Sequence, residues 1–224
     1  MDFDACRSVV KAGNSGKWLL KPTIKIAHLE EFSIINGIVT DDSVDENPIE
    51  GALVSAQIFN GGDTETKDDD ALIIKTATVT DPNGEYKLFV EPGTYNLVVY
   101  AEAKTPDFRK ISTTPGEVLE GATAEDFMLG GSAVGTVNGE ITISGAGDEQ
   151  HATLSFRQEA DCIDCADYEK IEIKAINVAN YTQYKTSLSV GTYSLAASSD
   201  GYLTQNPDDF NITDGGDITV DISF

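Results

Sequence analysis

Apolar and polar residues alternate on both sides of a short turn in residues 80–101, which read TDPNGEYKLFVEPGTYNLVVYA. The apolar positions of the two runs fall at every second residue: Tyr86, Leu88 and Val90, then Tyr95, Leu97 and Val99. A period of two on either side of a turn predicts an antiparallel hairpin with one buried face. Pro92 and Gly93 separate the two runs, and a second turn precedes the first run. In that second turn, Asn83 and Gly84 supply the positive φ angles that a narrow turn needs, and Pro82 sets φ just before them.

The chain also matches itself at an offset of about 98 residues. The sequence Tyr86-Lys87 followed by Gly93-Thr94-Tyr95 recurs as Tyr184-Lys185 followed by Gly191-Thr192-Tyr193. At the same offset the following residues align: Gly37 with Gly135, Val39 with Val137, and Ile58 with Phe156. We therefore predict two homologous domains, 32–131 and 132–224, with Tyr95 and Tyr193 buried at matching positions.

Each predicted domain contains short β-like segments and no helical period. In the first domain they are 33–41, 51–60, 71–80, 85–91, 94–102, 107–113 and 123–130; in the second they are 133–144, 151–158, 168–178, 183–190, 192–199, 208–213 and 217–224. Short segments separated by Gly, Asn and Asp turns are typical of antiparallel β-sandwiches. The predicted fold class is all-β, with two sandwiches in tandem.

The first domain resembles the carboxypeptidase regulatory-like domain family, whose fold is a transthyretin-like (immunoglobulin-like) β-sandwich. The resemblance is carried by an opening G-x-V-x-D strand, a P-x-x-G-A-x-V loop, a T-D-x-x-G-x-Y turn and a G-x-Y-x-L strand. These residues are Gly37, Val39, Asp41, Pro48, Gly51, Ala52, Val54, Thr80, Asp81, Gly84, Tyr86, Gly93, Tyr95 and Leu97. The second domain keeps fewer of these signals. The resemblance implies an accessory module of a secreted or cell-surface protein and no catalytic residues.

Residues 1–31 fit neither repeat and predict an N-terminal β-hairpin around Gly13 to Gly16. This segment is similar to the closing strands of a surface-lipoprotein domain of unknown function. Because a lone two-stranded hairpin is marginal in water, it needs a sheet to join. Its apolar side chains are candidate assembly residues: Trp18, Leu20, Ile24 and Ile26. The hairpin packs on its own first sandwich or donates strands to another subunit, and we expect donation.

Charge and hydropathy exclude several partners. The formal net charge is -23, from 38 acidic and 15 basic residues. Such a field repels nucleic acid and anionic membrane surfaces. No apolar run reaches the roughly 18 residues of a membrane span. The first 30 residues lack a secretory signal, so we expect a processed piece of a longer precursor or a chain that is not secreted.

The sequence offers little for catalysis. His28 and His151 are the only histidines, they lie in different segments, and neither belongs to a hydrolase or metalloprotease motif. We therefore predict that the protein is not an enzyme.

Cys162 and Cys165 form a C-x-x-C pair within DCIDCADY, and Cys6 is the third cysteine. Ala166 follows the pair, which excludes covalent haem attachment. Three alternatives remain open: a disulfide that closes a loop, thiols or a disulfide involving Cys6, and a metal site with Cys6 and His151 as further ligands. The disulfide is the leading candidate.

Acidic loops and sequons complete the candidate sites. No cofactor is predicted apart from calcium, for which the candidate ligands are Asp41, Asp42, Asp45, Asp68, Asp69 and Asp70. Their spacing is not that of an EF-hand, although several loops can supply ligands together. Asn180 and Asn211 begin Asn-x-Thr sequons and are glycosylation candidates.

The leading functional hypothesis is a non-catalytic extracellular or cell-surface structural protein that self-associates into a filament through its N-terminal strands. The alternative is a carbohydrate- or calcium-binding accessory module of a larger secreted protein.

Overall fold

The computed structural model describes residues 9–11, 18–20, 32–59, 72–120, 125–145, 147, 150–162, 165 and 169–224. Two short strands, β1 (Val9–Lys11) and β2 (Trp18–Leu20), pair antiparallel, as the predicted hairpin requires. The side chains of this hairpin lie outside the described residues, as do Ile24 and Ile26. Throughout the described part of the chain there is no helix, and hence none that could cross a membrane.

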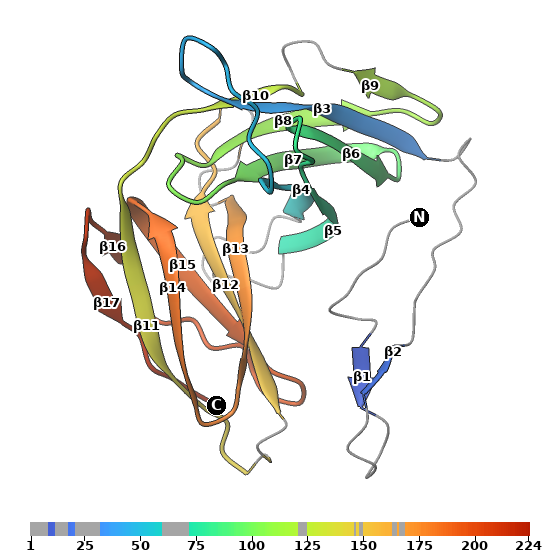
Figure 1. Ribbon diagram of the computed structural model, residues 1–224. Helices are drawn as coiled ribbons and strands as arrows, with labels where there is room; N and C mark the ends of the chain where they lie inside the picture. Colours follow the sequence, from blue (N-terminus) through green and yellow to red (C-terminus); the bar gives the residue numbers. More distant parts are fainter. Residues whose placement is uncertain are drawn as a thin grey trace.

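The first sandwich consists of two four-stranded sheets (Figure 1). One sheet has the order β10-β3-β6, and β9 also pairs with β3; its strands are β3 (Ser33–Asp41), β6 (Glu85–Val90), β9 (Val118–Glu120) and β10 (Phe127–Leu129). The other has the order β5-β4-β7-β8; its strands are β4 (Leu53–Phe59), β5 (Leu72–Val79), β7 (Gly93–Tyr100) and β8 (Asp107–Thr113).

The second sandwich repeats this arrangement strand for strand. One sheet has the order β14-β11-β17, with β18 also on β11; its strands are β11 (Val134–Thr142), β14 (Thr182–Ser189), β17 (Asp217–Thr219) and β18 (Ile222–Ser223). The other has the order β13-β12-β15-β16; its strands are β12 (His151–Glu159), β13 (Lys170–Ala179), β15 (Gly191–Ser198) and β16 (Phe210–Ile212). The fold is therefore all-β, with tandem antiparallel-rich sandwiches.

The repeat is real, but part of its predicted alignment was wrong. Gly37 lies opposite Tyr86, and Gly139 lies opposite Tyr184, so Gly37 corresponds to Gly139 and not to Gly135. Val39, two residues further along β3, likewise corresponds to Ile141 and not to Val137.

The same correction applies to the next strand. Ala56 lies opposite Leu97, and Phe156 lies opposite Leu195, so the partner of Phe156 is Ala56 and not Ile58. The hairpins keep a constant spacing because their turns are tight, whereas the loops that lead into them differ in length. A β-bulge follows Ala56 in β4 and Phe156 in β12, which supports the corrected alignment.

The turn that opens the hairpin depends on one glycine. Gly84 has φ of 75°, whereas Asn83 does not have a positive φ. The carboxylate Oδ1 of Asp81 accepts hydrogen bonds from the backbone N–H of Asn83 at 2.8 Å and of Glu85 at 2.9 Å. The Asp81 side chain therefore stabilises the turn by accepting hydrogen bonds from its backbone, as in an Asx turn.

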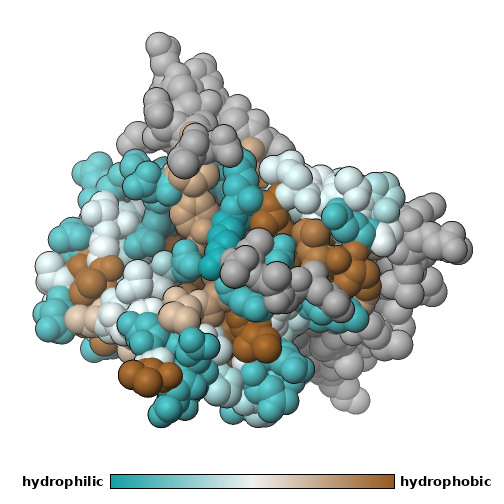
Figure 2. Space-filling view, turned by 90° about the horizontal axis from the view of Figure 1, so that it is seen from above, coloured by the Kyte–Doolittle hydropathy of each residue, from teal (hydrophilic) through white to brown (hydrophobic). Residues whose placement is uncertain are grey.

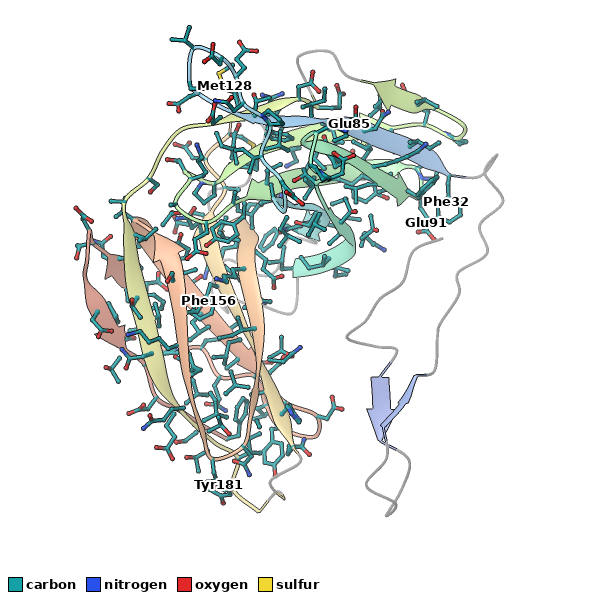
Figure 3. All side chains as sticks on the ribbon, in the orientation of Figure 1. Phe32, Glu85, Glu91, Met128, Phe156 and Tyr181 are labelled. Atoms are coloured by element: carbon teal, nitrogen blue, oxygen red, sulfur yellow. A yellow bond between two sulfur atoms is a disulfide. The ribbon has the colours of Figure 1, made fainter. Side chains whose placement is uncertain are left out.

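Each sandwich has its own apolar core. Tyr95 is 2% exposed and Tyr193 is fully buried, which confirms that the two matched tyrosines face their cores. Figure 3 shows Phe156 between the sheets of the second sandwich, while Met128 and Tyr181 lie at the outer ends of the molecule.

The hairpin of β6 and β7 departs from the sequence prediction on one side. In β6 the buried and exposed residues alternate, as predicted. In β7 every residue from Tyr95 to Tyr100 is buried, so the strand has two buried faces and not one. Tyr95, Leu97 and Val99 fill the first core, whereas Val98 and Tyr100 belong to the core of the second sandwich. The outer face of β7 is therefore part of a joint between the sandwiches.

Candidate functional site

The joint begins at the open edge of a sheet. Strand β13 is at the edge of its sheet, so part of its backbone has no strand partner on that side. Gln57 of β4 supplies the missing partner: its Nε2 donates to the backbone oxygen of Glu172 at 2.7 Å, and its Oε1 accepts from the backbone N–H of Glu172 at 2.8 Å. The side-chain amide of Gln57 thus makes the two backbone hydrogen bonds that a neighbouring strand would make at Glu172. Gln57 is only 1% exposed.

The side chain of Glu172 continues the hydrogen bonding into the second sandwich. Ser155 Oγ donates to Glu172 Oε2 at 2.5 Å, and Arg157 Nε donates to Ser155 Oγ at 2.8 Å. Burial raises the pKa of the Glu172 carboxyl, and the hydrogen bond from Ser155 and the charge of Arg157 partly counteract this.

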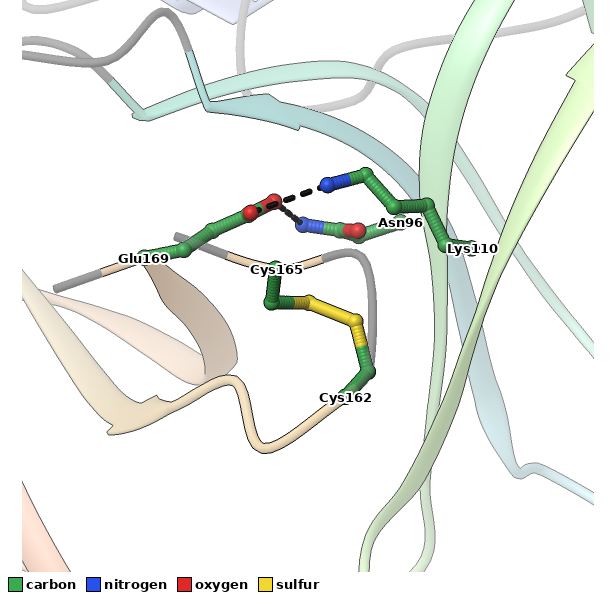
Figure 4. The surroundings of a disulfide bond; sticks show 5 residues. All are labelled: Asn96, Lys110, Cys162, Cys165 and Glu169. Atoms are coloured by element: carbon green, nitrogen blue, oxygen red, sulfur yellow. Dashed lines mark hydrogen bonds and ion pairs between the residues drawn. A yellow bond between two sulfur atoms is a disulfide. The ribbon is translucent and has the colours of Figure 1, made fainter. Parts of the chain in front are cut away.

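A second polar contact lies beside the first. Glu169, just before β13, accepts a hydrogen bond from Asn96 Nδ2 on its Oε1 at 2.6 Å, and its Oε2 lies 3.0 Å from Lys110 Nζ (Figure 4). Asn96 and Lys110 are direct cross-strand partners on β7 and β8. The carboxylate of the second sandwich is thus held by two neighbouring strands of the first.

Apolar contacts fill the rest of the joint. Val98 and Tyr100 are buried in the second core, and Phe108 packs against it. Lys174 Nζ lies 5.7 Å from the centre of the Tyr100 ring. Burial lowers the pKa of Lys174, and the charge of Glu102 opposes that shift; burial also raises the pKa of Tyr100 to about 12.

The connection between the sandwiches is tied down as well. Ser189 Oγ donates to the backbone oxygen of Lys104 at 2.5 Å, and the backbone N–H of Ser132 donates to the oxygen of Ala103 at 2.9 Å. The joint therefore combines a shared apolar core, directional side-chain bonds and a short connection.

Cys162 and Cys165 are joined in a disulfide in the loop between β12 and β13. The backbone N–H of Cys165 donates to the oxygen of Cys162 at 3.1 Å, and that of Ala160 donates to the oxygen of Glu169 at 2.7 Å. Figure 4 shows this disulfide beside Glu169. Cys6 lies outside the described residues.

The calcium candidates do not come together in the described part of the chain. Asp41 Oδ1 accepts hydrogen bonds from Ser43 Oγ at 2.5 Å and from the backbone of Asn47 at 3.0 Å. The hydrogen bond from Ser43 lowers the pKa of Asp41. Among described residues no three His, Cys, Asp or Glu side chains gather as metal ligands, so Asp41, Asp42 and Asp45 form no such group. Asp68, Asp69 and Asp70 lie outside the described residues.

The two sequons differ in environment. Asn180 is 3% exposed, its Oδ1 accepts from the backbone N–H of Ile143 at 2.7 Å, and its Nδ2 donates to the backbone oxygen of Ile143 at 3.2 Å. A glycan on Nδ2 would break this buried contact, which argues against Asn180 as an acceptor in the folded protein. Asn211 is exposed and keeps its place as a candidate.

A shallow hollow on the second sandwich bears on the carbohydrate alternative. It has a volume of about 360 Å³ and is lined by Gln158, Glu159, Lys170, Thr192, Tyr193, Ser194 and Asp209. Tyr193 is the aromatic member of this lining, but its ring is buried and stacks on Phe210 at 6.3 Å between centroids. Since small-molecule sites are usually lined by open apolar and aromatic surface, this hollow does not favour a carbohydrate.

The residues of the joint were missed by sequence reasoning. The predicted hairpin had a single buried face, formed in β7 by Tyr95, Leu97 and Val99, so nothing was predicted of Asn96, Val98 and Tyr100 on its other face. A signal was present, because Val98 and Tyr100 make that face largely apolar, which is typical of a strand buried on both faces. No such signal marked Gln57 or Glu169.

Comparison with known families agrees with the architecture. Residues 34–125 match the family model of the carboxypeptidase regulatory-like domain. The matched residues lie in the first sandwich, where the sequence motifs predicted the resemblance. The match covers neither residues 1–31 nor the second sandwich, so those parts of the resemblance remain predictions. No curated protein matches the chain.

Several solved structures resemble the chain at low identity. The TIE protein of Bacillus anthracis is 15% identical, with a TM-score of 0.34; the match covers 96% of this chain and 39% of that protein. A streptococcal ancillary pilin is 14% identical, with a TM-score of 0.30, over 86% of this chain and 62% of that one. The shaft pilin SpaA of Lactobacillus rhamnosus GG is 9% identical, with a TM-score of 0.31; the match covers 85% of this chain and 97% of that protein. Such scores assign no function to this chain.

Proposed function

We propose that this protein is a non-catalytic structural protein of the cell surface or extracellular space, in which two sandwiches act as one stiff unit. The observation that carries the proposal is the two-sided burial of β7, which makes one strand part of both cores. Two domains that share a core cannot reorient without exposing apolar side chains to water. The joint therefore fixes the orientation of one sandwich relative to the other.

The polar contacts of the joint support the same function. Apolar contact alone tolerates sliding, whereas the paired hydrogen bonds from Gln57 to Glu172 require one register. A disulfide beside the joint fits an oxidising compartment. The match of the first sandwich to the regulatory-like family fits an accessory role. The surface view in Figure 2 has apolar groups scattered between polar ones, as on a protein exposed to water.

Stiffness can be measured in solution. Heteronuclear NMR relaxation should give the two sandwiches one common rotational diffusion tensor in the intact chain. The double variant Gln57→Ala, Asn96→Ala should loosen the joint and give each sandwich its own, faster tumbling. Gln183→Ala removes an exposed glutamine of β14 and serves as the control. Independent tumbling in the unmodified protein would contradict the proposal.

Self-association through the N-terminal hairpin is part of this proposal. A strand pair that joins the sheet of another subunit makes a heterologous contact, and such contacts propagate into fibres unless they close a ring. Micrographs and sedimentation velocity of the chain with and without residues 1–31 provide the test. Filaments that disappear on deletion, while circular dichroism stays that of folded sandwiches, would support strand donation. A chain that is monomeric with its hairpin present would overturn it, and the stiffness of the joint would be unaffected.

We also propose that the boundary between the two domains lies between Gly131 and Ser132. Limited proteolysis should cut there only when the joint has been weakened, because the connection is held by Ser132 and Ser189.

A further inference from the structure

Several asparagines of the chain stand directly before a glycine, and the fold places them in unlike surroundings. The described pairs are Asn36-Gly37, Asn83-Gly84 and Asn138-Gly139, whereas Asn60-Gly61 lies outside the described residues. The side chain of such an asparagine can react with the peptide nitrogen that follows it, because glycine has no β-carbon to hinder the approach. The dipeptides are identical, so the fold decides which of them reacts first.

Two of the pairs lie in the centre of a sheet, at equivalent positions of the two sandwiches. Asn36 is in β3 between β6 and β9, and Asn138 is in β11 between β14 and β17. Asn138 Nδ2 also donates to Asp217 Oδ1, and its Oδ1 accepts from Thr219 Oγ1 at 3.0 Å. Cyclisation requires the backbone to rotate until the next nitrogen reaches the side-chain carbonyl carbon. Strand partners on both sides oppose that rotation.

Asn83 is placed differently, in the turn before β6. Its side chain is exposed and makes no hydrogen bond to the described residues. The turn is held at this point by the backbone N–H of Gly84, which donates to the oxygen of Asp81 at 2.9 Å, and by the N–H of Asn83, which donates to Asp81 Oδ1 at 2.8 Å. An exposed turn opens locally at a lower free-energy cost than the middle of a sheet.

We propose that Asn83 is a site of spontaneous deamidation, and that Asp81 sets its rate by holding the turn closed. Asn36 and Asn138 are the slow pairs. This inference does not depend on the structural role proposed above.

The reaction consumes one water and releases one ammonia. When the turn opens, the peptide nitrogen of Gly84 gives its proton to water or hydroxide and attacks Cγ of Asn83, which closes a succinimide ring. The bond between Cγ and Nδ2 breaks, and the amide nitrogen leaves as ammonia with a proton from water. Water then opens the ring at either carbonyl. The product is aspartate or, where the backbone now runs through the side chain, isoaspartate, and either one adds a negative charge beside Asp81.

Isoaspartate would also disturb the packing of the turn, because it inserts an extra methylene into the backbone. Gly84 fits tightly: an added Cβ would lie 2.5 Å from the backbone oxygen of Val39 and 3.1 Å from Pro48. The backbone N–H of Val39 donates to the oxygen of Gly84 at 2.9 Å. In the isoaspartyl form this bond should weaken, and the Val39 amide should exchange faster with solvent.

Peptide mapping of the intact chain after storage in mildly alkaline buffer tests the proposal. The peptide with Asn83 should change from the mass of the amide to that of the acid well before the peptides with Asn36 and Asn138. Electron-transfer fragmentation should identify isoaspartate at position 83. In urea the three pairs should convert at similar rates, because the unfolded chain exposes them alike.

Variants of the turn separate the site from its control by Asp81. Asp81→Ala should speed the conversion of Asn83 severalfold, whereas Asp81→Asn, whose amide oxygen can accept the same hydrogen bonds, should keep the parental rate. Asn83→Gln should stop the conversion of this peptide, since the longer side chain closes a ring far more slowly.

The contrary outcomes are distinct. Conversion of Asn36 or Asn138 as early as Asn83 in the folded protein would overturn the proposal, as would an Asn83 that stays unchanged while the chain in urea converts fully. Equal rates in the parent protein and in a folded Asp81→Ala variant would remove the role given to Asp81. If Asp81→Ala fails to fold, the comparison of the three pairs in the parent protein still decides the site.

Discussion

Tyr184 lies directly opposite Gly139 on the neighbouring strand, and its hydroxyl donates to the backbone oxygen of Val220 at 2.7 Å. That oxygen lies so close to Gly139 that an added Cβ would be only 2.0 Å from it. The first sandwich repeats the relationship: Tyr86 lies opposite Gly37 and donates to the backbone oxygen of Glu125 at 2.5 Å. In both sandwiches, a glycine thus allows the last segment of the chain to approach and a tyrosine holds it there.

Alanine at Gly139 should therefore destabilise the second sandwich. The added methyl group meets a backbone oxygen and the Tyr184 ring, neither of which can move freely, and overpacking of this kind costs about 1–3 kcal/mol. Gly37→Ala should do the same in the first sandwich, where the nearest backbone oxygen would be at 2.5 Å. Differential scanning calorimetry should show a lower melting temperature for each variant. Gly131→Ala is the control, because nothing lies within 4 Å of its added Cβ; equal melting temperatures for all three would contradict the packing argument.

Alkaline pH should weaken the folded protein. Burial, with a contribution from the charge of Asp221, raises the pKa of Tyr184 to about 12, whereas an unfolded tyrosine ionises near about 10. The neutral hydroxyl is thus favoured in the folded state. Its contribution to the free energy of unfolding is fully present below about pH 10 and is lost as the pH rises toward about 12. Tyr184→Phe should make the melting temperature fall less steeply across that interval. Tyr181→Phe, which alters an exposed tyrosine, should leave the slope as it is.

Gln57→Ala should expose the edge of β13. Without the amide, the backbone N–H and oxygen of Glu172 lose their partners, and an unsatisfied buried pair of this kind costs about 1–3 kcal/mol. Hydrogen exchange gives the most direct readout, since the Glu172 amide should be protected in the parent protein and exchange faster in the variant. The amide of Ala160, which donates to Glu169, reports whether the neighbouring loop has opened too. Unchanged protection at Glu172 would mean that Gln57 does not cap this edge.

The disulfide should be present and should contribute modestly to stability. Without reductant, the mass should be two hydrogen atoms lighter than that of the dithiol, whereas stoichiometric zinc would favour the metal alternative. Because the closed loop is short, the chain-entropy estimate of its contribution is about 2 kcal/mol. The double variant Cys162→Ser, Cys165→Ser should therefore melt at a lower temperature in oxidising buffer and match the parent protein once both are reduced.

Strand positions were predictable because they depend on local pattern. The alternation in β6 and the turn residues Asp81 and Gly84 indicated the hairpin without any knowledge of its surroundings. The segments that were misjudged lack such signals. Val118–Glu120 pairs with β3 but was missed because three residues show no period, and the predicted segment 217–224 divides into β17 and β18.

The joint was not predictable for a different reason. Whether Gln57 or Asn96 faces water or another sheet depends on where the second sandwich lies, and alternation along one strand carries no information about that. Glu169 stands in an acidic loop and looks like any solvated carboxylate until the fold places it against Lys110. The predicted calcium ligands depended on tertiary structure in the same way, because acidic residues that are close in sequence need not bring their carboxylates together in space.

The pairing of the first and last strands of each sandwich has a mechanical consequence. β10 runs parallel to β3, and β18 runs parallel to β11. When a chain is pulled from both ends, parallel terminal strands are drawn in opposite directions along their common axis, so their hydrogen bonds carry the load together. An antiparallel hairpin pulled from its open end would instead release its bonds one after another. Tension applied along this protein would therefore meet two shear-loaded clamps in series, each of which resists until it yields as a whole.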